Sequence, residues 1–128
     1  LKVNAADEDP ARIIFISSAA ASENNARVMA YSTSKAAVEK MTSLLALALC
    51  DDHILVNAIA PGAFYSEMTR NTWEDRDRLQ SLVERIPIHR FGEPEDIAGV
   101  AVMLCSRAGA YFTGEVLHVD GGHRLTFS

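Results

Sequence analysis

The 128-residue sequence is poor in the features that mark metal-binding and disulfide-bonded proteins. It has only two cysteines, Cys50 and Cys105, and they lack the spacing of metal or redox sites. Both fall within apolar helical patterns, which predicts reduced cysteines in the core. The four histidines show no mutual ligand spacing and no nearby cysteine, so we predict no metal site.

Long hydrophobic runs and basic clusters are also missing. The longest apolar stretch, residues 44–50, is far shorter than the roughly 20 residues of a membrane-spanning helix. The net charge is −5, which argues against binding to nucleic acid or to an anionic membrane. Because no targeting segment is seen, we expect a cytoplasmic protein.

The sequence does contain short β-branched runs that are separated by helical patterns. Continuous apolar runs predict parallel strands that are covered on both faces. These runs lie at residues 13–16, 54–59 and 116–119. Apolar residues recur at spacings of three and four in the segments between them, which predicts helices. The helices are expected within residues 38–49, 79–86 and 97–104, and Glu93-Pro94 should start the last one. One α/β domain follows from this alternation.

Polar residues and a flexible turn lie where two of the predicted strands end. Ser17 and Ser18 end the first strand, and Pro61-Gly62 follows the second. In open parallel sheets, ligands bind beyond the carboxyl ends of the strands. A Pro-Gly pair by itself is most often an ordinary turn, but glycine also lets the backbone approach a flat ligand. We therefore expect a ligand site at this edge of the sheet.

Tyr31 and Lys35 lie one helical turn apart, and Tyr31 follows Ser18 by thirteen residues. Many such pairs are only exposed neighbours on a helix. An ammonium close to a phenol favours the phenolate, and such a tyrosine can give a proton to a carbonyl oxygen or take one from an alcohol. Ser18 can hold the same oxygen by a hydrogen bond. No side chain delivers hydride, so a nicotinamide cofactor would have to supply it.

Five segments in this order and spacing resemble the short-chain dehydrogenase/reductase superfamily, and within it most closely the ketoacyl-reductase-like carbonyl reductases. The segments are the strand that ends in Ser17-Ser18, residues 31–37, residues 56–62, residues 90–99, and residues 113–114 with 119–122. The resemblance implies an α/β fold that is the C-terminal portion of a doubly wound Rossmann-type parallel sheet. That portion would hold the last three strands and their flanking helices.

The resemblance also implies a role for each candidate residue. Tyr31 would be the general acid/base, Lys35 would favour its phenolate and bind the ribose, and Ser18 would orient the carbonyl. The implied cofactor-binding residues are Tyr31, Lys35, Pro61, Gly62, Phe64 and Ser66. Ser66 stands where the family usually has a threonine. Tyr65, Met68 and Trp73 are candidate pocket walls, although Trp73 is equally well explained as packing.

Several motifs of the family are missing from these 128 residues. The sequence has no Gly-rich phosphate-binding turn, no cofactor-selecting residue after a second strand, and no Asn-Asn-Ala-Gly-like motif. Residues 1–6 are typical of the tail of a helix. We therefore expect residues 1–128 to be one partial NAD(P)-binding Rossmann-type domain whose N-terminal half is absent.

Two functions remain open from the sequence. The first is the catalytic part of an NAD(P)-dependent oxidoreductase that interconverts a carbonyl and a secondary alcohol. Its substrate would be a small molecule, NADP is favoured over NAD by the resemblance, and the full-length parent would be a homodimer or homotetramer. The 128 residues alone are expected to be inactive. The second is a truncated, non-catalytic binding or oligomerisation module that lacks the dinucleotide phosphate site.

Overall fold

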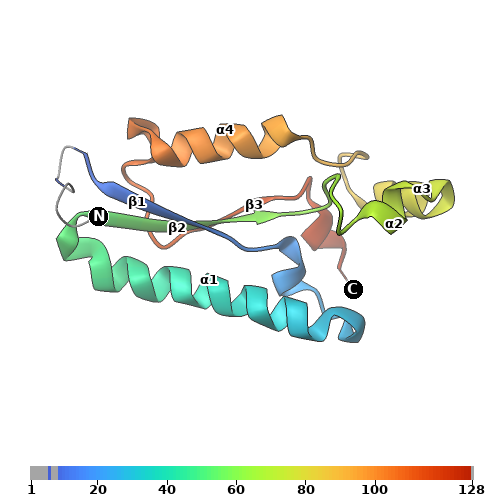
Figure 1. Cartoon of the computed structure of the whole chain (residues 1–128), viewed down its shortest axis with the longest axis horizontal. Coiled ribbons are helices and arrows are strands. Elements are labelled where there is room, and N and C mark those ends of the chain that lie inside the picture. Colours follow the sequence, from blue (N-terminus) through green and yellow to red (C-terminus); the bar gives the residue numbers. More distant parts are fainter. Residues whose placement is uncertain (1–5, 7–8, 128) are drawn as a thin grey trace.

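Three parallel strands form one sheet in the computed structural model, which describes residue 6 and residues 9–127. Their order is β1 (Ala11–Ile16), β2 (Ile54–Pro61) and β3 (Val116–Val119). Helix α1 (Met29–Leu49) lies along one face of the sheet and α4 (Pro94–Cys105) along the other (Figure 1). The predicted α/β fold with flanking helices is confirmed. That these are the last three strands of a larger sheet stays a prediction.

The remaining elements are short and lie mostly at the carboxyl end of the sheet. Two helices gather beyond the end of β2, α2 (Arg70–Trp73) and α3 (Arg76–Arg85) (Figure 1). The 3-10 turns are η1 (Ala19–Ser22), η2 (Ala26–Val28), η3 (Cys50–Asp52), η4 (Arg107–Gly109) and η5 (His123–Thr126). The predicted helix tail at residues 1–6 falls outside the described residues except for Ala6. Because α2 has only four residues, it leaves no periodic pattern in the sequence.

The core lies around β2, the central strand. Its buried apolar side chains are Ile54, Val56, Ala58, Ile59 and Ala60. A helix covers each face of the sheet, so β2 has no polar face and reads as a continuous apolar run. The exception is Asn57, whose Nδ2 donates to the Phe112 carbonyl (2.8 Å) and whose Oδ1 accepts from the Glu115 N–H (3.1 Å). Asn57 therefore fixes the loop that leads into β3.

Strand β2 is longer than the sequence predicted, because it includes Pro61. The sequence pattern ended the strand at Ile59 and placed Pro61 in the next loop. In the sheet, Pro61 pairs with Val119, and the next donor along the chain, the Gly62 N–H, reaches the Val119 carbonyl at 2.9 Å. Proline is tolerated here because its nitrogen faces β1, whose pairing with β2 ends at Ile16, so no ladder hydrogen bond is lost.

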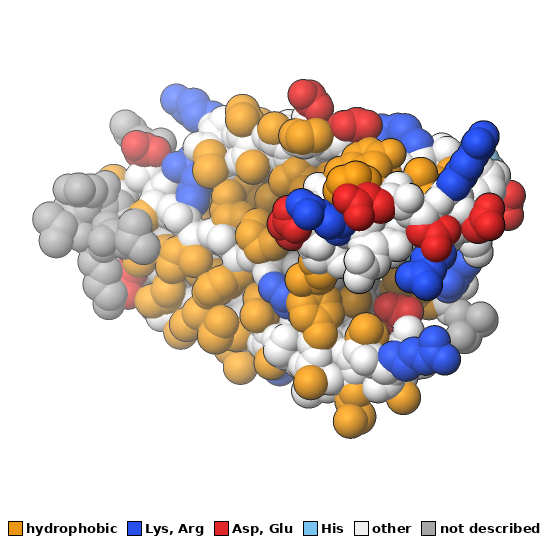
Figure 2. Space-filling view, turned by 45° about the vertical axis from the view of Figure 1, so that its right-hand side comes forward, with side chains coloured by type: hydrophobic (Ala, Val, Ile, Leu, Met, Phe, Trp, Pro, Cys, Tyr) orange, Lys and Arg blue, Asp and Glu red, His pale blue; other side chains and the backbone are white. Residues whose placement is uncertain are grey.

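Helix α1 turns only part of its apolar pattern toward the sheet, where Leu45 and Leu49 pack against the core. Its buried residues are the small side chains Ser32, Thr42 and Ala46. Met41 and Leu44, which belong to the same pattern of apolar spacing, are 41% and 54% exposed. Because α1 carries apolar residues on two faces, spacing alone could not select the inner one. Hydrophobic side chains are accordingly widespread on the surface in Figure 2, while charged side chains gather toward its right-hand end.

The prediction that both cysteines lie in the core is wrong. Cys50 and Cys105 are free and exposed. Cys105 is the last residue of α4, and Cys50 comes directly after α1. Each follows the part of its helix that packs on the sheet, so the apolar pattern overstated its burial.

Within residues 6 and 9–127, no group of three or more His, Cys, Asp or Glu side chains is placed to hold a metal ion.

The predicted start of α4 is confirmed, and an ion pair holds it. The Asp96 carboxylate accepts the Glu93 N–H at 2.8 Å and both terminal nitrogens of Arg90 at 2.7 and 2.9 Å. The Arg90 hydrogen bonds, followed by the one from the Glu93 backbone, lower the pKa of the Asp96 carboxyl to about 2. The pKa of Arg90 is raised by the same contact. This contact ties the loop before α4 to its first turn.

No helix in the described part of the chain is long and apolar enough to cross a membrane.

Candidate active site

Ser17 anchors the end of β1 to both of its neighbours. Its N–H donates to the Ile59 carbonyl at 2.7 Å, which continues the hydrogen-bond ladder with β2. Its buried hydroxyl donates to Glu39 Oε1 on α1 at 2.9 Å and lies 3.3 Å from the Lys35 carbonyl oxygen. A buried hydroxyl in such contacts holds strand and helix in one geometry. The next residue, Ser18, is thereby given a fixed position.

Ser18 begins the turn that leaves the sheet. Its Oγ accepts the Ala20 N–H at 3.2 Å and caps η1. This bond uses the hydroxyl oxygen as an acceptor and leaves its proton to donate elsewhere. The side chain is half-buried at the carboxyl end of the sheet. Ser18 can therefore donate a hydrogen bond to a ligand oxygen.

Lys35 joins Tyr31 to the end of β1. The Lys35 ammonium donates to the Ile16 carbonyl at 2.9 Å, two residues before Ser18. The same nitrogen lies 5.7 Å from the centroid of the Tyr31 ring. Both side chains are half-buried. An ammonium has three N–H donors, so the bond to Ile16 leaves two for a ligand. This arrangement differs from an exposed pair on a helix surface, because the lysine is tied to a neighbouring strand.

A cavity of about 140 Å³ brings Ser18 together with the loop after β2. Pro61, Gly62 and Ala63 line it beside Ser18. Phe64 does not line this cavity, because its ring covers Gly92 and its carbonyl accepts the Thr69 hydroxyl at 2.6 Å. The structure thus gathers four of the predicted residues directly and leaves Phe64 and Ser66 farther along the loop. Three of the four, Ser18, Pro61 and Gly62, line one cavity. The fourth, Lys35, is hydrogen-bonded to Ile16 at the end of β1.

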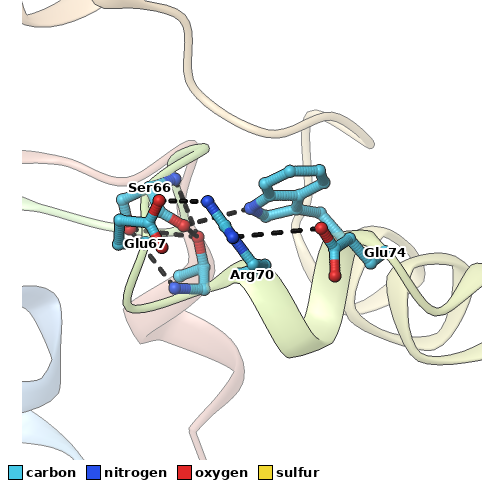
Figure 3. Close-up of polar contacts among 6 residues, drawn as sticks. Ser66, Glu67, Arg70 and Glu74 are labelled. Carbon is cyan, nitrogen blue, oxygen red and sulfur yellow. Dashed lines mark hydrogen bonds and ion pairs between the residues drawn. The ribbon is translucent and has the colours of Figure 1, made fainter.

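Ser66 lies in a compact turn at the start of the segment that carries α2. Its hydroxyl lies 3.1 Å from the Thr69 hydroxyl, and its carbonyl accepts the Trp73 indole N–H at 3.1 Å. Figure 3 shows this turn with Arg70, which forms ion pairs with Glu67 and Glu74. These local bonds give the loop a defined shape with Ser66 exposed on it.

The aromatic residues of this loop pack on one another. The Tyr65 ring meets the edge of Trp73 at 6.1 Å between centroids and lies 4.9 Å from the Phe91 ring. Trp73 therefore takes part in packing, one of the two roles the sequence left open, while Met68 is largely exposed. Whether any of these residues contacts a substrate stays a prediction.

Gly62 lies directly against Asp120, at the end of β3. The sequence had suggested a different reason for this glycine, the approach of a flat ligand. A Cβ at this position would lie 2.6 Å from the Asp120 Cα, which leaves no room for a methyl group. The Asp120 carboxylate is itself held by the N–H groups of Gly122 and Arg124, at 3.0 and 2.9 Å. The end of β3 therefore cannot move away easily.

Replacement of Gly62 by alanine should lower the free energy of unfolding by about 1–3 kcal/mol, the usual cost of overpacking. Gly99→Ala is the matched control, because beyond the neighbouring residues and backbone of α4 itself no described atom lies within 4 Å of the added Cβ. There, alanine should stabilise the helix by roughly 0.5–1 kcal/mol. Urea unfolding of both variants in the full-length protein measures the two effects. Equal stability of the two variants would contradict the close approach of β2 and β3.

Two residues that support the site were missed in the sequence. Glu39, which holds Ser17, lies four residues after Lys35 on α1, so helical spacing alone could have singled it out. Thr69 follows Ser66 by three residues and organises the turn after β2. A serine and a threonine at this spacing are a local signal for such a turn.

The chain is similar to known proteins along nearly its whole length. A family model described as enoyl-(acyl carrier protein) reductase matches residues 2–124. The rhamnolipids biosynthesis 3-oxoacyl-(acyl-carrier-protein) reductase of Pseudomonas aeruginosa is 44% identical over 126 residues, which are 98% of this chain and 49% of that protein. The 3-oxoacyl-(acyl-carrier-protein) reductase of Aquifex aeolicus is 43% identical over 87% of this chain and 44% of its own length.

A solved structure agrees with these sequence matches. The active-site complex of Pseudomonas aeruginosa RhlG with NADP superposes with a TM-score of 0.92 and 42% identity. The alignment covers 97% of this chain and 49% of that one. The chain spans about half the length of the relatives it matches.

Proposed function

The chain belongs to the short-chain dehydrogenase/reductase family, and on that premise we propose that its residues are the catalytic part of an NAD(P)-dependent carbonyl reductase. One observation carries the proposal. The Lys35 ammonium bonds the Ile16 carbonyl, two residues before Ser18, and lies 5.7 Å from the centroid of the Tyr31 ring, so the cation links the helix that carries the phenol to the carboxyl end of the sheet, where Ser18 lies. This is the place where open parallel sheets bind ligands.

In this proposal each side chain acts on the carbonyl oxygen. Ser18 donates a hydrogen bond to it and fixes its direction. The Tyr31 phenol gives it a proton as negative charge develops there, and Lys35 stabilises the phenolate that remains. A bound nicotinamide would supply the hydride. In the reverse direction Tyr31 would take the hydroxyl proton of a secondary alcohol, and a bound oxidised nicotinamide would accept the hydride from its carbon.

The residues present fit one end of the cofactor. The two remaining N–H donors of Lys35 suit ribose hydroxyls, and the loop that ends at Ser66 leaves the carboxyl end of the neighbouring strand β2. A Gly-rich turn for the pyrophosphate is absent from residues 1–128. These residues would therefore hold the nicotinamide end, and the phosphates would need other parts of a full-length protein.

The relatives support NADP as the cofactor and a 3-oxoacyl thioester as the substrate. The solved relative is a complex with NADP, and two relatives are named as 3-oxoacyl-(acyl-carrier-protein) reductases. We also propose that the full-length parent is a cytoplasmic homo-oligomer. The exposed apolar residues Met41, Leu44 and Leu47 of α1 are consistent with contact to a second copy.

The proposal is tested by comparing the full-length protein with the 128-residue chain. The full-length protein should consume NADPH only when a carbonyl substrate, such as a 3-oxoacyl thioester, is present. The chain alone should bind neither NADPH nor NADH tightly in calorimetry, because it lacks the pyrophosphate turn. A full-length protein that binds NADPH but reduces no carbonyl would refute the catalytic function and favour the non-catalytic module. Micromolar binding by the 128 residues alone would refute the partial-domain interpretation.

A further inference from the structure

The turn after β3 closes the cavity beside Ser18. The 3-10 turn η5 follows β3 and packs against η1, which follows β1. As a result, His123 and Phe127 line the same cavity as Ser18 and Gly62. His123 follows Ser18 by more than 100 residues in the sequence. The His123 ring meets the Phe127 ring edge-on, with 4.9 Å between centroids. This turn therefore forms a wall of the proposed active site.

His123 is the polar group of that wall and has an unused nitrogen. The residue is only 9% exposed, and its Nε2 is buried without a hydrogen-bond partner among the described residues. Burial, and then the positive charge of Arg85, lower the pKa of the imidazole, while Glu23 and Asp120 act in the opposite direction. A neutral imidazole nitrogen can accept or donate one hydrogen bond, depending on the tautomer.

A buried polar atom without a partner is uncommon, because it costs free energy that a hydrogen bond would recover. The cavity of about 140 Å³ beside His123 has room for a few heavy atoms. It is too small for a long acyl chain. The Nε2 atom has almost no accessible surface of its own, so a rotation of the imidazole ring would present it to a short polar group that enters beside Ser18.

We propose that His123 binds the substrate, and that its Nε2 forms a hydrogen bond with a second oxygen near the carbonyl that Ser18 orients. The proposal rests on the proposed function. It names the substrate class as a carbonyl compound that carries another oxygen on a nearby carbon, as the thioester carbonyl of a 3-oxoacyl compound does. A simple ketone has no second oxygen that could form a hydrogen bond with His123. His123 thus discriminates between the two classes.

The test compares a 3-oxoacyl thioester with a simple monoketone in the full-length enzyme. His123→Phe keeps a planar ring against Phe127 and removes the nitrogen. The thioester kcat/KM should fall about tenfold, mainly through KM, because one hydrogen bond in a buried site is lost. The monoketone kcat/KM should stay within about twofold, and NADPH affinity should not change. His123→Gln, which can still form the hydrogen bond, should recover most of the thioester activity.

Leu125→Ala is the matched control, because Leu125 lies in the same turn with its side chain exposed. It should leave both substrates unaffected. Thermal unfolding checks that the His123 variants are folded. Should the Phe variant fail to fold, the pair His123→Asn and His123→Leu replaces it, and only the leucine variant should lose the preference for the thioester.

Equal losses with both substrates, or no loss with either, would overturn the role of His123. A wild-type enzyme that reduces neither substrate would instead contradict the proposed function. The two failures are therefore distinguishable.

Discussion

Tyr31→Phe in the full-length protein is expected to remove nearly all carbonyl reduction, with kcat lowered by at least about a hundredfold. The variant keeps the aromatic ring beside the Lys35 ammonium and loses only the phenolic proton. NADPH should therefore still bind. Stopped-flow or steady-state consumption of NADPH gives kcat, and fluorescence titration gives the dissociation constant of the cofactor.

Tyr111→Phe is the control for this substitution. Tyr111 is fully exposed in the loop between η4 and β3. The same chemical change there should leave kcat as in the wild type. A Tyr31→Phe enzyme that binds NADPH normally and keeps more than a few per cent of kcat would show that Tyr31 is not the acid.

Lys35→Ala is expected to damage both catalysis and cofactor binding. The substitution removes the hydrogen bond to the Ile16 carbonyl and the cation beside Tyr31. A charge-assisted hydrogen bond is worth roughly 1.5–3 kcal/mol, so the affinity for NADPH should fall at least about tenfold. The basic limb of the pH–rate profile should also move to higher pH, because the phenolate loses its nearest cation. Calorimetry with NADPH and a pH–rate profile measure the two effects separately.

Lys40→Ala provides the matched control, since Lys40 is exposed on the same helix. It should bind NADPH and respond to pH as the wild type does. If Lys35→Ala loses cofactor affinity but keeps the wild-type pH–rate profile, the coupling between Lys35 and Tyr31 is refuted while its role toward the ribose remains.

Much of the fold could be predicted because its elements follow simple periodicities. The three strands are β-branched runs, and the start of α4 is marked by Glu93-Pro94 with an acidic first turn. What spacing could not give was the inner face of α1. Both of its faces carry apolar residues, and only packing against β2 selects the side with Thr42 and Ala46.

The candidate site was predictable to a different extent. Tyr31, Lys35 and Ser18 were candidates from the sequence, because helical spacing and the end of a strand suggest a shared position, and their catalytic role stays a prediction. The cavity wall at His123 could not, because it depends on how the turn after β3 packs against the turn after β1. Likewise, the sequence analysis explained Gly62 by the approach of a ligand. The structure shows that the Asp120 backbone lies against it.

The contacts of Ser17 affect how the molecule opens. Its amide is bonded to Ile59 in the central strand, and its hydroxyl to Glu39 on α1, while Lys35 on the same helix holds Ile16. Separating β1 from both β2 and α1 would break all of these bonds along with part of the core. The proposed catalytic residues therefore belong to the same cooperative unfolding unit as the centre of the sheet. They should be protected from the local fraying that governs hydrogen exchange in exposed loops.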